Sequence, residues 1–245
     1  MDEKLNKKIN FLTGYAIVST VAFAFILFSS FNVKDKNLNV DELTLKRLNL
    51  IGEDGSLRVV ISNETRQHPG RIDGKDLPKR ERPAGIIFFN NEGDECGGIV
   101  FGLNKKEDVV HSGISFTMDN YRNDQVVQIL NNETYKNDNA EIVRGLMFNE
   151  FPIGSSLTSA ITKFDELNKI TDPEKKKEKE KELESTEGSR RRLFIGRNTN
   201  NDNGLFLYDS AGMLKMKIYV DKEGKPKIEV INKEGEGKNI LIDSN

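Results

Sequence analysis

One uncharged stretch constrains this chain more than any other feature of its sequence. Residues 11–31 carry no charged side chain, although 31% of the residues in the chain are charged. A helix of about 20 mostly apolar residues is long enough to cross the roughly 30 Å hydrocarbon core of a bilayer. We therefore predict a transmembrane helix over residues 11–31, preceded by an N-terminal tail (1–10) and followed by a tether (32–41).

Three other interpretations of this stretch fit less well. A cleavable signal peptide has an apolar core of only about 7–15 residues and a cleavage site of small residues, which Phe28-Ser29-Ser30-Phe31 does not provide. A lipoprotein would need a cysteine just after the stretch, and the single cysteine of the chain is Cys96. A buried core helix of this length that is apolar on every face is unusual in a chain of this size.

The orientation of this helix depends on weaker signals. Basic residues lie on both sides of the apolar stretch: Lys4, Lys7 and Lys8 before it, and Lys34, Lys36, Lys46 and Arg47 after it. Long domains can be translocated largely regardless of charge, and the tail is too short to be a domain. We expect a single-pass membrane protein with a cytoplasmic tail, a large extracytoplasmic domain, and the lipid bilayer as its partner through residues 11–31.

Composition excludes some classes of function. Acidic residues number 39 and basic residues 37, so the chain lacks the basic excess of a nucleic-acid binder. One cysteine allows no intramolecular disulfide, and one cysteine with two histidines gives no zinc pattern. Neither residues 92–95 nor residues 198–203 have the ligand spacing of a calcium loop. We expect no metal site and no cofactor.

Glycine turns recur along the rest of the chain. Residues 43–51 and 57–62 read as two strands joined by Asp54-Gly55, which is a strong hairpin signal. Four further turns have Asp or Asn first and Gly fourth, at residues 90–93, 209–212, 221–224 and 232–235. The first side chain accepts backbone hydrogen bonds of the turn, and Gly takes the positive φ that follows. Such spacing predicts an antiparallel meander.

Apolar and polar residues alternate along the predicted strands. Leu214, Met216, Ile218 and Val220 share one face of a strand, and lysines lie on the other. Further strands are expected at 113–118, 125–130 and 141–148, with an Asn-rich turn at 131–139. We predict a mainly β fold of antiparallel meanders that forms a sandwich, a barrel or an oligomeric β-prism. The β-rich region (42–154) and a β-meander (188–245) belong to one domain.

A helical insertion (155–187) is expected between these two β regions. Ser155 or Ser156 can cap a first helix, and Asp172-Pro173 is suited to the start of a second. Residues 174–184 hold five Lys and five Glu and one apolar residue. We expect that second helix to be solvated, either projecting or frayed, because it has no apolar stripe with which to pack.

The most unusual segment is the basic loop, residues 66–82. It has no apolar run, and a long loop without secondary structure in a compact domain is usually functional or disordered. Arginine forks could bind the oxygens of an anion or phosphate group in pairs. The alternative is a charged surface insertion. The candidate ligand-binding residues are Arg66, His68, Arg71, Lys75, Arg80 and Arg82.

Catalytic groups are sparse. A cysteine nucleophile is usually activated by a histidine base, and the only histidines available to Cys96 are His68 and His111. The pair Asp119 and Asp124 could do acid–base work, although their Asn-rich surroundings suggest turn capping instead. A hydrolase that uses Cys96 or the two aspartates is therefore the third hypothesis, and no catalytic residue is assigned.

Several segments resemble a group of bacterial proteins. They are residues 43–51 with 54–58, residues 82–93 with 96–98, residues 124–127, and the closing glycine-turn meander. The group has one N-terminal membrane span and a β-rich domain, and no activity is established for it. The resemblance implies a bacterial origin and an anchored β domain, and it implies no site residue.

These observations favour a function without catalysis. We expect a membrane-anchored scaffold or adaptor of the cell envelope that binds an envelope protein or its own copies, with a trimer as the favoured homo-oligomer. The alternative is a module that binds an anionic ligand through the basic loop.

Overall fold

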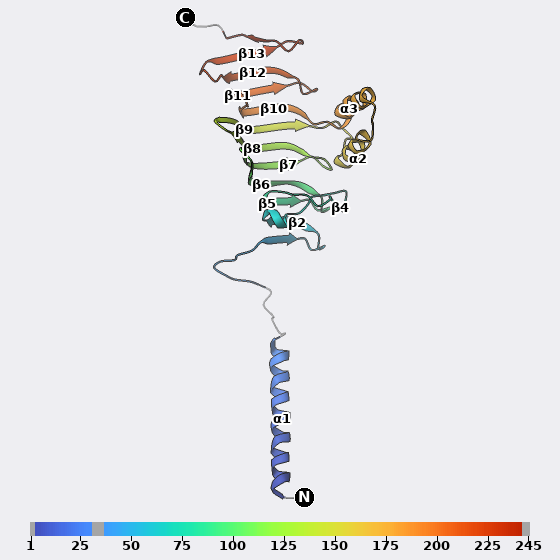
Figure 1. Ribbon diagram of the computed structural model, residues 1–245, viewed down its shortest axis with the longest axis vertical. Coiled ribbons are helices and arrows are strands. Elements are labelled where there is room, and N and C mark those ends of the chain that lie inside the picture. Colours follow the sequence, from blue (N-terminus) through green and yellow to red (C-terminus); the bar gives the residue numbers. More distant parts are fainter. Residues whose placement is uncertain (1–2, 31–36, 242–245) are drawn as a thin grey trace. The chain divides into compact units, whose positions relative to one another are not determined.

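The computed structural model describes residues 3–30 and 37–241, which divide into two units, 1–44 and 45–245 (Figure 1). The first unit contains helix α1 (Glu3–Ser30), of which Glu3–Phe28 is long and apolar enough to span a membrane. The helix begins before the predicted span, so the residues expected as a tail are helical from Glu3. Phe31 and the first part of the predicted tether lie outside the described residues.

Within the described residues, the second unit is built on one open antiparallel sheet of twelve strands that follow each other nearly in sequence order. The strands are β1 (Arg47–Ile51), β2 (Leu57–Ser62), β5 (Ala84–Phe89), β6 (Glu95–Lys106), β7 (Val109–Asp119), β8 (Gln125–Lys136), β9 (Asn139–Glu150), β10 (Arg190–Arg197), β11 (Asn203–Tyr208), β12 (Leu214–Val220), β13 (Pro226–Ile231) and β14 (Gly237–Asn239). The predicted mainly β fold of antiparallel meanders is confirmed. The described strands form a single layer with β1 and β14 as its edges, which is neither a sandwich nor a closed barrel.

The glycine turns have the geometry that the sequence predicts. In the β11–β12 turn, the Asp209 carboxylate accepts hydrogen bonds from the backbone N–H groups of Ala211 and Met213, both at 2.9 Å. Gly212 follows with φ +78°. The same arrangement recurs after β10, where Asn201 takes the positive φ (+65°) in place of glycine. These turns reverse the chain tightly enough to place β11 and β12 beside the strands that precede them.

The central strands are longer than predicted. Strand β8 continues to Lys136, so the turn expected at 131–139 is wrong: most of that segment is strand, and the reversal uses Asn137, with φ +51°, and Asp138. Strand β6 runs through Gly97 and Gly98. Polar side chains are tolerated there because a single-layer sheet keeps much of its surface in water.

The remaining elements attach to the ends and to one face of the sheet. A 3-10 turn, η1 (Glu64–Arg66), leads into the basic loop, which holds a small hairpin of β3 (Arg71–Ile72) and β4 (Lys75–Asp76). The helical insertion is confirmed as α2 (Leu157–Leu167), capped by Ser156, and α3 (Pro173–Glu187), capped by Asp172. Helix α3 is not frayed: it packs on α2, and Leu167 and Leu183 are both buried.

Candidate functional site: an uncovered apolar face

Strand pairing gives the sheet two faces of different character. The face that carries Ile129 and Ile195 is named the apolar face, and the face that carries Leu130 and Phe194 is named the covered face. Cross-strand partners lie on the same face, so the register connects them into ladders that run across the strands. The first ladder of the apolar face is Leu48, Ile61, Ile86, Ile99, Phe116, Ile129, Leu146, Ile195, Leu205, Ile218 and Ile228.

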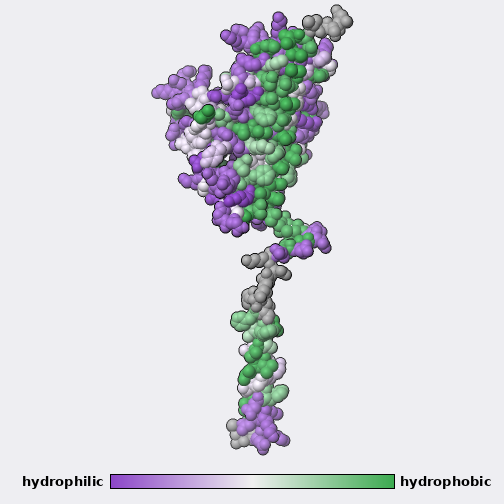
Figure 2. Space-filling model, turned by 180° about the vertical axis from the view of Figure 1, so that it is seen from behind, coloured by the Kyte–Doolittle hydropathy of each residue, from purple (hydrophilic) through white to green (hydrophobic). Residues whose placement is uncertain are grey.

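A second ladder runs beside the first, two residues further along each strand. It consists of Leu50, Val59, Phe88, Gly97, Met118, Val127, Phe148, Leu193, Leu207, Met216 and Val230. Eleven consecutive strands therefore contribute two neighbouring positions each, and Gly97 is the single position without an apolar side chain. Hydrophobic residues form one continuous band over the sheet in Figure 2.

Nothing in the described part of the chain covers this face. Thirteen of its large apolar side chains are at least 39% exposed: Leu48, Leu50, Ile61, Phe101, Leu103, Ile114, Met118, Ile129, Phe148, Ile195, Ile218, Val220 and Val230. Leu103 is the most exposed of them, at 70%. A monomeric soluble domain rarely leaves a contiguous apolar patch larger than a few hundred Å², so a face of this extent is a candidate interaction surface.

Polar residues border the two ladders at the middle of the sheet. This central polar group consists of Asn131, Glu133, Tyr135, Arg144 and Arg197, all on the apolar face of β8, β9 and β10. Arg144 donates to Glu133 at 2.6 Å and to Asn131 at 2.5 Å, and the Tyr135 hydroxyl donates to Glu133 at 3.0 Å. The hydrogen bond from Arg144 lowers the pKa of Glu133, which stays ionised. The buried Nε of Arg197 has no hydrogen-bond partner in the described residues.

The covered face is packed against other elements of the same chain. Val60, Ile87 and Phe89 form one buried cluster, and Ile72 of the small hairpin is also buried. The hairpin is fixed by Asp94, which is 2% exposed and accepts from the backbone N–H groups of Asp73 (2.9 Å) and Gly74 (2.8 Å). The basic loop therefore acts as a lid on this face, and we name it the lid.

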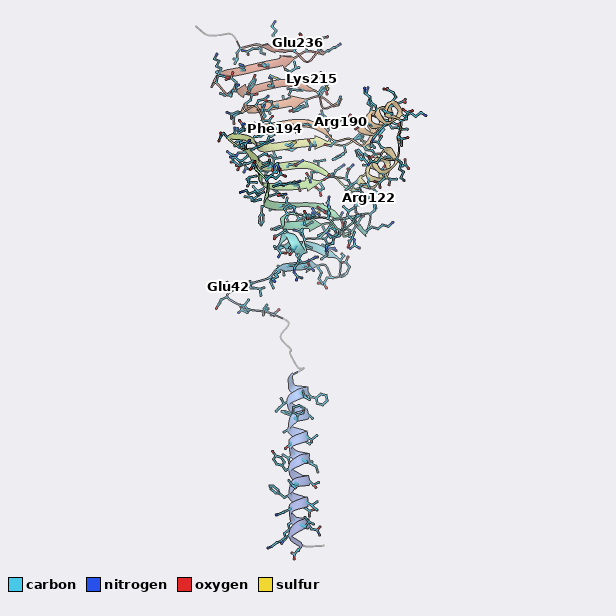
Figure 3. All side chains as sticks on the ribbon, in the orientation of Figure 1. Glu42, Arg122, Arg190, Phe194, Lys215 and Glu236 are labelled. Atoms are coloured by element: carbon cyan, nitrogen blue, oxygen red, sulfur yellow. The ribbon has the colours of Figure 1, made fainter. Side chains whose placement is uncertain are left out.

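Further along the sheet, aromatic rings replace the lid. Phe194, Phe206 and Tyr219 form the second buried cluster (Phe194 is labelled in Figure 3). They lie beside a row of glycines, and a Cβ built on Gly204 would approach the carbonyl oxygen of Ile218 to 2.1 Å. Glycine is required there because only its bare backbone lets the rings lie flat on the sheet.

Charged side chains complete this cover. The guanidinium of Arg191 lies 5.9 Å from the centre of the Phe194 ring, and the ammonium of Lys217 lies 4.7 Å from the centre of the Tyr219 ring. The Tyr219 hydroxyl donates to Glu229 at 2.6 Å, and Glu229 also pairs with Lys217. Long charged side chains can shield apolar surface with their stems while their heads stay in water.

Several of the six basic candidates of the lid have partners within the chain, and His68 and Arg71 both lie near Asp76. Arg82 pairs with Glu95 through two hydrogen bonds of 2.8 Å, and Arg71 lies 3.5 Å from Asp76. Arg80 donates to the carbonyl oxygen of Pro69, which links two parts of the lid to each other. The remaining three candidates are His68, Arg66 and Lys75.

His68 is buried at 4% exposed, and its ring packs edge-on against Phe89. The side chains of Arg66 and Lys75 are exposed and have no hydrogen-bond or ion-pair partner in the described residues. Anion binding by this loop stays a prediction, and these two side chains together with exposed Arg80 are the ones that remain accessible for it.

An acidic group lies under the base of the lid. Burial and the nearby charges of Glu95 and Asp124 raise the pKa of Asp119 to about 7, against the opposing effect of Arg82. One carboxylate oxygen of Asp119 is buried without a hydrogen-bond partner in the described residues. Cys96 lies in the same surroundings, and its burial, with Asp119 and Glu95, raises the pKa of its thiol.

This arrangement does not activate Cys96. His111 pairs with Asn104, eight positions along β6 from Cys96, which is more than about 20 Å at roughly 3.3 Å per residue. The Nδ1 atom of His68 accepts from the N–H of Gly70, so it is not free to take a proton from a thiol. A cysteine nucleophile needs the opposite shift of pKa and a base within reach.

Comparison with known proteins gives no match to a family model, a curated protein or a solved structure. The resemblance to a bacterial group with one membrane span therefore stays a prediction. The two ladders were missed at the level of the sequence because they depend on cross-strand register. The signal that could have found them is the repeated Ile or Leu at alternating positions in consecutive strands.

Proposed function

We propose that the protein is a membrane-anchored scaffold, without catalytic activity, whose sheet self-associates through its apolar face. The observation that supports this most strongly is the pair of apolar ladders that cross eleven consecutive strands without cover. Anchoring in the lipid bilayer is supported by helix α1, of which Glu3–Phe28 is long and apolar enough to span a membrane. A bacterial envelope, a cytoplasmic tail and an extracytoplasmic sheet belong to the same proposal and are expectations from the sequence.

The extent of the face fits a protein interface. Twelve strands about 4.8 Å apart make a strip about 50 Å long, and two ladders about 7 Å apart make it somewhat over 10 Å wide. The flat footprint of about 600 Å² is comparable with the roughly 800 Å² that each partner buries in a standard interface. Thirteen half-exposed apolar side chains at about 1 kcal/mol each would contribute on the order of 10 kcal/mol before the cost of association.

A second copy of this chain is the occupant that fits this strip. The strip needs a partner that is apolar over the same length and polar opposite the central polar group, and the same face of another copy meets both conditions. Copies anchored in one membrane are also held at a high effective concentration, which favours their association. An interface of this kind uses the same patch on each subunit.

The test is the oligomeric state of the full chain in a mild detergent, measured by sedimentation equilibrium with the detergent density-matched. We expect the parent protein to sediment as an oligomer and the Ile129→Asp variant to sediment as a monomer. Assembly would bury the new carboxylate in the first ladder, and burial of an unpaired charge is costly. Asn132→Asp, on the covered face of the same strand, adds the same charge and is the matched control.

Far-ultraviolet circular dichroism shows whether the sheet survives the substitution. If Ile129→Asp unfolds the sheet, Ile218→Lys tests the same ladder four strands away. A parent protein that is a single copy, or folded ladder variants that assemble as the parent does, would overturn the proposal.

A further inference from the structure

We propose that the lid is acid-sensitive: protonation of His68 breaks the contact that holds the base of the β3–β4 hairpin, and the lid then leaves the covered face. This inference does not depend on self-association through the apolar face. It rests on the burial of the His68 ring, on the hydrogen bond that this ring accepts from Gly70, and on the place of Gly70 in the lid.

The His68 side chain is held as a neutral ring. It is 4% exposed, and its ring centre lies 4.8 Å from that of Phe89, in the buried cluster under the lid. Its Nδ1 atom accepts from the N–H of Gly70 at 3.1 Å, so the single proton of the neutral ring lies on Nε2. A charged ring carries a proton on both nitrogens. The new N–H at Nδ1 would point at the N–H of Gly70, and the hydrogen bond between them would be lost.

Gly70 is the residue at which the lid hairpin begins. Its carbonyl oxygen accepts from the N–H of Leu77 at 2.9 Å, one pair beyond the β3–β4 ladder. Its φ is +105°, and a Cβ built there would approach a carboxylate oxygen of Glu95 to 2.9 Å. The backbone of Gly70 therefore lies against the carboxylate that pairs with Arg82. His68 holds the backbone at the point where the hairpin meets this ion pair.

The surroundings of His68 do not favour a charged ring while the lid is closed. Burial lowers the pKa of His68, and Arg47 and Arg82 act in the same direction, against the opposing effects of Asp76 and Glu95. The Asp76 carboxylate lies 3.8 Å from Nε2, and water screens its attraction because the side chain is 56% exposed. Arg82 also donates to the carbonyl oxygen of His68 at 3.3 Å, which keeps a positive charge beside this residue.

The direction of the pH effect follows from the difference between the closed and the open lid. An open lid gives His68 its ordinary pKa of about 6.5, whereas the closed lid lowers it. As pH falls below about 6.5, the open lid binds a proton that the closed lid does not, and opening becomes more frequent. Opening in acid would uncover Val60, Ile87 and Phe89, which form a second apolar surface.

The test is hydrogen exchange of residues 68–77 in the full chain in mild detergent, measured by mass spectrometry at about pH 7.5 and about pH 5.5. Each rate is divided by that of the same segment in the unfolded chain at the same pH, which gives the protection of the lid. The variant is His68→Asn, whose side-chain oxygen can accept from Gly70 and cannot gain a proton.

We expect the ratio of parent protection to His68→Asn protection to fall by about five- to tenfold between the two pH values, since one unit of pKa is a factor of about ten. Asp119 also titrates in this range, with the opposite effect on opening, because burial raises its pKa to about 7. It contributes equally to the parent and the variant, so the ratio removes it. A ratio that is the same at both pH values would overturn the proposal.

His111→Asn is the matched control and allows a second measurement. His111 is exposed on β7, so this variant should keep the acid response of the parent protein. His68 is then the only histidine of the chain, and NMR of its ring measures its pKa directly. We expect a pKa below 6.5 and a loss of lid protection as the ring gains its proton. This measurement decides the question if His68→Asn does not close its lid, and a ring that titrates while lid protection stays constant would contradict the proposal.

Discussion

Two neighbouring residues of strand β10 show how differently the two faces of this sheet are completed. Phe194 points to the covered face, packs against Phe206, and is 3% exposed. Ile195 points to the apolar face and is 45% exposed. Both belong to the same alternating pattern, and both have the large apolar side chain of a buried position.

The difference comes from what the chain supplies to each face. The covered face receives the lid over β2 and β5, and the aromatic rings of β10 to β12, which lie beside glycines. The apolar face receives no element from the described part of the chain. Burial on one face is therefore a property of the single copy, whereas burial on the other would require another molecule.

The largest expected effect is the loss of stability when a buried side chain on the covered face of β10 is truncated. Phe194→Ala should lower the free energy of unfolding by about 3–5 kcal/mol, since it removes a buried ring and leaves a cavity. This loss should be independent of protein concentration. The measurement is urea unfolding of the full chain in detergent, followed by the β-sheet dichroism signal.

Ile195→Ala is the paired substitution and should behave differently. A single copy should lose only about 1 kcal/mol, because the side chain is already half in water. The loss should grow as protein concentration rises and copies assemble. Equal, concentration-independent losses for the two variants would mean that the two faces do not differ as described.

The second expected effect concerns the acidic group under the lid. The pKa of Asp119 is about 7 in the folded protein and 3.8 ordinarily, so between these values the folded state binds more protons than the unfolded state. The free energy of unfolding should therefore fall as pH rises from about 4 to about 7, and should level off above that. Asp119→Asn should flatten this slope and stabilise the protein at pH 8 by a few kcal/mol.

The matched control for this substitution is Asp138→Asn, in the exposed turn between β8 and β9. It removes the same charge far from the acidic group and should leave the slope unchanged. If Asp119→Asn and the parent protein show the same pH dependence from 4 to 7, Asp119 is ionised normally and the covered face does not hold it in a desolvated setting.

Much of the fold could be predicted from local signals. Asp209 and Gly212 define a turn by their own chemistry, and Asp172-Pro173 begins a helix without help from distant residues. Strand ends were harder, since Asn131 and Asn132 favour turns locally but continue β8 because both neighbouring strands pair with them. Pairing across strands overrides local preference there.

The candidate sites were less predictable. The basic residues of the lid suggest an anion site in the sequence, yet Arg82 meets Glu95 from a different strand, and that pairing cannot be read from spacing. Alternation correctly indicates that Ile195 shares a face of its strand with Leu193. It does not reveal that no element of the same chain covers Ile195, because that depends on the topology of the whole sheet.

The smallest expected effect tests whether the lid is what closes the covered face. Asp94→Ala removes the acceptor of two backbone N–H groups in the hairpin turn and should cost about 1–3 kcal/mol locally. The lid should then open more often, and trypsin should cleave after Arg71 and Lys75 several times faster than in the parent protein. Asp209→Ala, which removes a similar acceptor from the β11–β12 turn, should leave those two cleavage rates unchanged. Unchanged cleavage in Asp94→Ala would show that the ion pair of Arg82 and Glu95 holds the lid closed without Asp94. The cover on this face would then depend on that ion pair and not on the hydrogen bonds at the hairpin turn.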